Sequence, residues 1–287
     1  MGKAHETAGK NKEAEALYDR YARSARSVDS QVEALVRLAT VQKGNERAVA
    51  SALDRAVRTA AQRKSQLGDR GKYYAAKARY MQGEAVLREY ETVKIEGDVK
   101  QLKSRLKRKS ELLKKAADTF LATAEMGVAE WTTAALYQIG FTYESFASAL
   151  LNSPPPDSLS AEEKELYQQS IEEFVIPIEE RGLEAYESGW NKAIELSIYN
   201  SWTAKMRTAL GRLNAELYPP LKEVGFELRS RGPLPLPGLI QGPRRQSNGQ
   251  AQRYLVPVND KDKAKPKNGA KEPEKPAASL GRRGGAS

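Results

Sequence analysis

Apolar residues recur at helical spacing along the chain as far as Tyr218. Leu102, Leu106, Leu113 and Phe120 fall at positions i, i+4, i+11 and i+18, which places them on one face of a helix. Alanine, leucine, glutamate, lysine and arginine dominate the composition, and all of them favour helices. Runs rich in valine and isoleucine, which are typical of strands, are nearly absent. The pattern therefore predicts an all-α fold.

Capping residues and prolines predict where some helices begin and end. Ser160 followed by Glu163 is a capping-box pattern and predicts the start of a helix. Pro177 is expected to kink or break that helix, because proline lacks the amide hydrogen that the helix needs. Asn200 predicts the N-cap of a further helix, which the proline pair at 219–220 is expected to end.

The composition changes sharply near Tyr218. Ten of the 14 prolines lie beyond this residue, and residues 221–287 hold 14 Lys/Arg against 6 Asp/Glu. Most of the net charge of +10 therefore belongs to this basic Pro/Gly-rich tail. Such a composition cannot bury enough apolar surface to offset the entropy of ordering, so we expect the tail to be disordered.

Two segments of the chain resemble each other at an offset of 35 residues. Residues 16–25 and 51–60 share the pairs Asp19/Asp54, Arg20/Arg55, Arg23/Arg58 and Ala25/Ala60, and Gly9/Gly44 fit the same offset. Tetratricopeptide repeats (TPRs), which are antiparallel helical hairpins, have a period of about 34 residues. The pattern predicts two TPR-like repeats over 1–65, an expanded TPR-like helical region over 66–220, and the tail over 221–287. The alternative is an ordinary helical bundle with chance similarity.

Helical hairpins need a glycine at the tight turn, alanines at close contacts and larger side chains in the remaining gaps. Gly9, Ala14 and Tyr18 match these three roles in a second helix, so the repeats are expected to stack as an α-solenoid. Leu136, Ile139, Gly140 and Tyr143 have the spacing of a first helix. With Gly9 at a turn, Met1 falls at about the seventh position of a repeat, and most of the first half of that repeat's first helix is missing. We therefore expect the chain to be the C-terminal part of a longer repeat protein or to have a misassigned start.

Several motifs between residues 70 and 220 carry a more specific resemblance. They are the segments 134–146, Pro154–Pro156, Tyr186–Glu187, Asn191–Ala193, Tyr199–Trp202 and Tyr218–Pro219. This region resembles the C-terminal part of long deltaproteobacterial TPR proteins, among them the myxobacterial adventurous gliding motility components. The resemblance implies a scaffold in a multiprotein machine that is periplasmic or envelope-associated. If the chain does not share the properties of this family, we expect it to be cytoplasmic.

The composition argues against an enzyme. Cysteine is absent and histidine occurs once, at His5, so thiolate sites and histidine-based triads or zinc sites cannot be built. We therefore expect no catalytic residues, no metal and no cofactor. The acids around Pro177 could in principle hold a cation or transfer protons, but adjacent glutamates are far more common on a helix surface; they are Glu172, Glu173, Glu179 and Glu180.

The residues most suited to bind a partner protein are Tyr137, Phe141 and Glu144. They fall on the concave side of their repeat if Leu136 occupies the first large-residue position, and first-helix residues on that side contact peptides in this fold. Packing against the next repeat is the alternative. We expect the three tryptophans to serve in core or inter-repeat packing; they are Trp131, Trp190 and Trp202.

Residues 99–115 form a strongly basic run with Glu111 as its single acid. Its candidate patch consists of Lys100, Lys103, Lys107 and Arg108, and the run also includes Arg105, Lys109, Lys114 and Lys115. A solvated helix face is the usual explanation for such a run. The alternative function is a helical protein that associates with nucleic acid or an anionic membrane through this helix and the tail. No aromatic residue interrupts the run, which argues against binding single-stranded nucleic acid.

Overall fold

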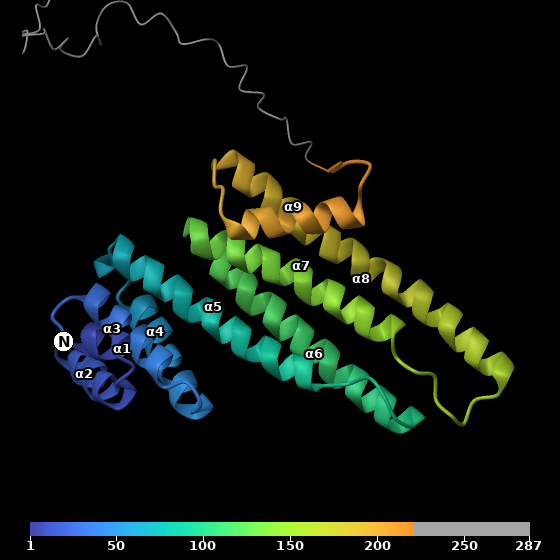
Figure 1. The fold of residues 1–287 in the computed structure, drawn as a ribbon, viewed down its shortest axis with the longest axis horizontal. Coiled ribbons are helices and arrows are strands. Elements are labelled where there is room, and N and C mark those ends of the chain that lie inside the picture. The colour runs from blue at the N-terminus through green and yellow to red at the C-terminus, as the bar shows by residue number, and fades with distance from the viewer. Residues whose placement is uncertain (221–287) are drawn as a thin grey trace, which may run out of the picture. The chain divides into compact units, whose positions relative to one another are not determined.

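The computed structural model describes residues 1–220, and every regular element in this range is a helix (Figure 1). The all-α prediction is confirmed for this part of the chain. The elements are α1 (Gly2–Thr7), α2 (Asn11–Ser24), α3 (Val28–Val41), α4 (Glu46–Gln62), the 3-10 turn η1 (Lys64–Gln66), α5 (Asp69–Thr92), α6 (Val99–Ala124), α7 (Ala129–Leu151), α8 (Ala161–Glu195) and α9 (Ser201–Leu213). The disorder expected for 221–287 concerns residues outside the described range.

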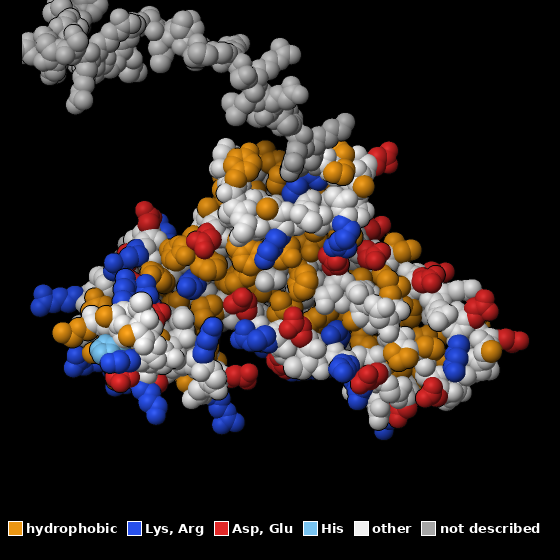
Figure 2. Space-filling model, viewed as in Figure 1, with side chains coloured by type: hydrophobic (Ala, Val, Ile, Leu, Met, Phe, Trp, Pro, Cys, Tyr) orange, Lys and Arg blue, Asp and Glu red, His pale blue; other side chains and the backbone are white. Residues whose placement is uncertain are grey.

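The helices pack in chain order, each against the next. In addition, α3 contacts α5, α5 contacts α7 and α7 contacts α9, so that α5, α7 and α9 lie side by side (Figure 1). Among the described residues, no extensive contact joins two even-numbered helices. On the face shown in Figure 2, the largest group of hydrophobic side chains lies over the N-terminal half of α7, between α5 and α9.

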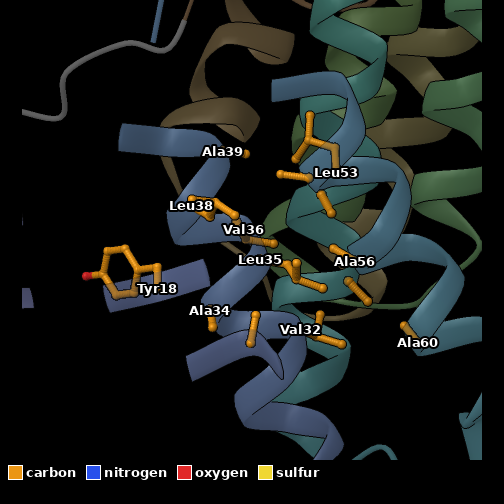
Figure 3. Packing of buried hydrophobic residues seen from close by; sticks show 14 of the residues in the cluster. Tyr18, Val32, Ala34, Leu35, Val36, Leu38, Ala39, Leu53, Ala56 and Ala60 are labelled. Atoms are coloured by element: carbon orange, nitrogen blue, oxygen red, sulfur yellow. The ribbon is translucent and has the colours of Figure 1, made fainter. Parts of the chain in front are cut away.

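The N-terminal core is centred on α3, which is enclosed by α2, α4 and α5. Val32 and Val36 of α3 are completely buried and face Leu53 and Ala56 of α4 (Figure 3). Tyr18 of α2 belongs to the same cluster but lies at the left of the view, away from the α4 residues. Ten of the fourteen residues of α3 are buried, because the helix contacts partners on several sides.

Two predicted turn glycines adopt backbone conformations that other residues rarely tolerate. Gly9, between α1 and α2, has φ +70°, and Gly44, between α3 and α4, has φ +98°. A Cβ atom at either position would meet nothing within 4 Å. Glycine is therefore required here by the left-handed backbone and not by lack of space.

The predicted helix starts are confirmed, no break occurs at Pro177, and the helix end predicted at the proline pair 219–220 is wrong. Ser160 and Glu163 form the capping box of α8, and Asn200 caps α9. However, α8 continues through Pro177, which lies on the exposed side of the helix. Helix α9 ends at Leu213, before the prolines, because the chain turns back after it.

Helices α7 and α8 approach each other closely at two glycines. A Cβ on Gly140 would lie 2.6 Å from ring atoms of Tyr186, whereas one on Gly182 would have its nearest neighbour at 3.5 Å. Tyr186 is only 1% exposed. The ring of Tyr186 thus occupies the space that the missing side chain of Gly140 leaves, which agrees with the close helix approach expected at this glycine.

Candidate binding site

A series of contacting aromatic side chains, here called the aromatic row, runs where α5, α7 and α9 meet. In order of contact it consists of Tyr74, Tyr73, Trp131, Tyr80, Trp202, Tyr137 and Phe141. Successive ring centroids are 5.3, 5.6, 5.1, 6.1, 5.6 and 6.2 Å apart. Rings at these separations attract one another and pack as a rigid unit.

The row is partly buried and partly open. Tyr80 and Trp131 are 3% and 8% exposed and form its buried centre. The remaining members are half-buried and present part of their rings to solvent. Figure 2 shows the corresponding hydrophobic area over α7, with both basic and acidic side chains at its edges. The row therefore joins the core to an exposed apolar surface.

Three cations lie over rings of the row. The guanidinium of Arg37 is 5.8 Å from the Tyr74 ring, but it also pairs with Glu33 and Glu6. The ammonium of Lys77 is 5.9 Å from the Trp131 ring, and that of Lys205 is 4.4 Å from the Trp202 ring and 5.6 Å from the Tyr137 ring. Within residues 1–220, neither ammonium group forms an ion pair or a hydrogen bond, although the charge of Lys77 helps to offset the effect of burial on the pKa of Glu84.

A hollow of about 360 Å³ opens at the end of the row, between α7, α8 and α9. It is lined by Tyr137, Phe141, Glu144, Tyr186, Ala204, Lys205, Thr208, Ala209 and Arg212. Aromatic rings and two alanines supply an apolar floor, while one lysine, one arginine and one threonine supply hydrogen-bond donors. A few polar groups around an apolar floor are typical of binding sites.

Glu144 binds the two other polar side chains on one side of the hollow, Tyr186 and Arg212. The Tyr186 hydroxyl donates a hydrogen bond to its Oε2 atom over 3.1 Å, and Arg212 pairs with its Oε1 atom over 2.6 Å. Burial, together with the Glu144 carboxylate, raises the pKa of Tyr186 well above its usual range, so this hydroxyl remains a donor. Arg212 is 56% exposed and keeps further N–H donors beyond those that meet Glu144.

The three residues singled out from the sequence all line the hollow. Tyr137 and Phe141 are stacked, one helical turn apart on α7, and Glu144 lies beside them. The sequence reasoning did not include the cation Lys205 and assigned Trp202 to packing alone. The spacing Trp202–Lys205 is a weak local signal, because residues three apart share a helix face. The sequence contains no pattern that predicts contact between this face of α9 and Tyr137 of α7.

The basic run has divided roles. On α6, Lys100, Lys103 and Lys107 are exposed, whereas Arg108 is bound to the carboxylate of Glu89. Lys109 is 5% exposed and donates hydrogen bonds to the backbone carbonyls of Tyr90 and Val93, at 3.0 and 2.7 Å. Burial lowers the pKa of its ammonium group. Lys109 thus satisfies the C-terminal end of α5, and only part of the run forms a surface patch.

Two other groupings are weaker candidates. A hollow of about 450 Å³ on α5 and α6 is lined by cations and acids together and by no aromatic side chain: Arg79, Glu111, Lys114, Lys115, Asp118 and Thr119. The four glutamates around Pro177 are exposed. In the part of the chain that the structure describes, no group of His, Cys, Asp or Glu residues is arranged to hold a metal ion, and no helix is long and apolar enough to span a membrane.

Comparisons of this chain with protein families, with characterised proteins and with solved structures give no match. Function is therefore inferred from the geometry of the aromatic row and the hollow.

Proposed function

We propose that the protein is a non-enzymatic scaffold that binds a segment of another protein along the aromatic row and in the hollow beside it. The observation that carries this proposal is the combination of a rigid, partly open aromatic surface with a hollow whose rim bears Lys205 and Arg212. Aromatic and arginine side chains supply most of the binding energy in protein interfaces. Because the row is packed before a partner arrives, little entropy is lost on binding.

The scaffold is proposed to be an α-solenoid of TPR-like hairpins. Contacts between successive odd-numbered helices support it, because stacked hairpins place their first helices side by side along one surface. A shared packing feature also supports it: in three hairpins, a glycine of the first helix faces a ring of the second. A Cβ would meet that ring at 2.8 Å for Gly2 and Tyr18, 2.5 Å for Gly83 and Phe120, and 2.6 Å for Gly140 and Tyr186.

We further propose that the protein belongs with the deltaproteobacterial TPR proteins of the adventurous gliding motility type, in a periplasmic or envelope-associated complex. The support is the sequence resemblance between residues 70 and 220. Tyr137, Phe141 and Tyr186 belong to that region and line the hollow, so the partner segment would contact the part of the chain that resembles this family.

Filling the hollow tests the docking site. Ala204 is exposed at its edge, so Ala204→Trp should occupy the hollow without disturbing the core. The matched control is Ala50→Trp, an exposed alanine on α4. The full chain and both variants would be used to capture partners from an extract of the source organism, with quantification by mass spectrometry.

We expect Ala204→Trp to lose at least one protein that the unchanged chain and Ala50→Trp both retain. The same set of proteins on all three baits would mean that the hollow takes no part in recognition.

A second candidate function is association with anionic surfaces through α6. The favouring observation is that Lys100, Lys103 and Lys107 are exposed and have no ion-pair partner within residues 1–220. Changing all three to Gln should then abolish binding to vesicles that contain anionic lipid, and binding by the unchanged chain should weaken steeply with salt. Binding that survives the triple change would remove this candidate.

A further inference from the structure

Lys77 and Lys205 are the two cations over the aromatic row that form no ion pair or hydrogen bond within residues 1–220. Some lysines of this chain pair with a carboxylate, as in Lys72–Asp69 and Lys192–Glu195. Lys77 and Lys205 form no ion pair among residues 1–220 and lie instead over ring faces, although the charge of Lys77 also acts on the Glu84 carboxylate. A ring face attracts a cation but leaves most of its N–H donors free.

These two lysines lie close enough to act on one short segment. Lys77 is held over Trp131 and Lys205 over Trp202, and the rings of both tryptophans contact Tyr80, at 5.1 and 6.1 Å. An extended peptide advances about 3.3 Å per residue. A segment of about seven residues can therefore reach both ammonium groups while one of its side chains enters the hollow.

We propose that the site selects acidic segments, in which a large apolar side chain enters the hollow and flanking carboxylates meet Lys205 and Lys77. This inference rests on the proposed docking function and adds the chemistry of the partner. Arg212 reinforces it, because the guanidinium is more than half exposed after pairing with Glu144 and has donors left for a third carboxylate.

The same residues favour a peptide over a nucleic acid. Base stacking needs a ring with an open face. In the centre of the row the rings of Tyr80 and Trp131 are covered by neighbouring side chains, and lysines lie over the faces of Trp131 and Trp202. What remains open is the apolar floor of the hollow, which suits a single side chain such as Leu or Phe.

The test is a selection from a library of random twelve-residue peptides displayed on phage, with the full chain as bait. Peptides that also bind Ala204→Trp would be removed first, because they attach elsewhere, for example to the basic tail. The affinities of enriched peptides would then be measured by fluorescence anisotropy for the full chain and for two double variants. These are Lys77→Gln with Lys205→Gln, and the matched control Lys100→Gln with Lys103→Gln on α6.

We expect enriched peptides to combine a large apolar residue with an excess of Asp and Glu. Their affinity should fall about fivefold to tenfold in the Lys77/Lys205 variant, as two partly exposed ion pairs imply, and should be unchanged in the α6 variant. Added salt should reduce the difference between the full chain and the Lys77/Lys205 variant, because exposed ion pairs are screened.

Each contrary result has a distinct meaning. The preference for acidic segments would be refuted if the enriched peptides were neutral or basic. It would also be refuted if they bound the Lys77/Lys205 variant equally well. Either result would leave the docking site itself supported. Failure to enrich any peptide that depends on Ala204 would overturn the docking site itself. If an oligothymidylate of twelve nucleotides bound the full chain but not the Lys77/Lys205 variant, the site would be one for nucleic acid, and the acidic-peptide inference would be wrong.

Discussion

A methyl group at Gly140 should destabilise the protein, whereas the same methyl group at Gly182 should not. Both glycines lie where α7 meets α8, and both are buried in helices. The new Cβ at Gly140 would lie 2.6 Å from two ring atoms of Tyr186, far inside the usual separation of about 3.5–4.0 Å between carbons. The ring cannot swing away freely, because it is buried and its hydroxyl is bonded to Glu144. At Gly182 the nearest atom is at 3.5 Å, an ordinary contact.

The comparison of Gly140→Ala with Gly182→Ala isolates this clash. Both variants gain helix propensity, about 1 kcal/mol for glycine to alanine, so that gain cancels in the difference. Overpacking costs about 1–3 kcal/mol, so Gly140→Ala should be less stable than Gly182→Ala by that amount. For a folded unit of this size, each kcal/mol lowers the melting temperature by about 2–4 °C. Calorimetry on the two full-length variants measures the difference; equal melting temperatures would show that the contact between Gly140 and Tyr186 is wrong.

Two further predictions concern buried charges. Lys109→Met leaves the Val93 carbonyl without its donor, while the Tyr90 carbonyl keeps the Val93 amide, and should lower the free energy of unfolding by about 1–3 kcal/mol. Lys103→Met on the exposed side should change it by less than about 0.5 kcal/mol, and urea denaturation measures both. Burial would raise the pKa of Glu33, but hydrogen bonds from Arg37 and Lys3 outweigh it and lower the pKa below its ordinary value. The stability that Glu33 contributes is thus present above its unfolded pKa and lost as the pH falls. Between about pH 6 and about pH 3 the melting temperature should fall further for the unchanged chain than for Glu33→Gln; parallel curves would contradict this role.

Sequence reasoning located features that depend on neighbouring residues. The capping box at Ser160, the cap at Asn200 and the turn glycines Gly9 and Gly44 were all found, because each is a local pattern of residue types. The break expected at Pro177 does not occur, because the effect of this proline depends on tertiary packing and not on a local pattern. Whether a proline interrupts a helix depends on which side faces the neighbouring helix, and that is decided by packing with α7.

The candidate site shows the same limit. Tyr137 and Phe141 could be named from the sequence, because they share one face of a single helix. Their association with Trp202 and Lys205 could not, since α9 is far along the chain and carries no motif that points to α7. Likewise, eight basic residues in one run look equivalent, yet only the fold buries Lys109 and leaves Lys103 in solvent.

The most direct test of the docking site is a photo-crosslinking measurement in the source organism. A photoreactive phenylalanine at Thr208 would stand exposed on the lining of the hollow, and the same group at Ser104 would stand exposed on α6 as the control. The account predicts a discrete adduct with another protein from position 208, which disappears when Ala204→Trp is added, and none of the same mass from position 104. An identical adduct from both positions, or one from 208 that persists with Ala204→Trp, would contradict the claim that the hollow between α7, α8 and α9 binds a partner.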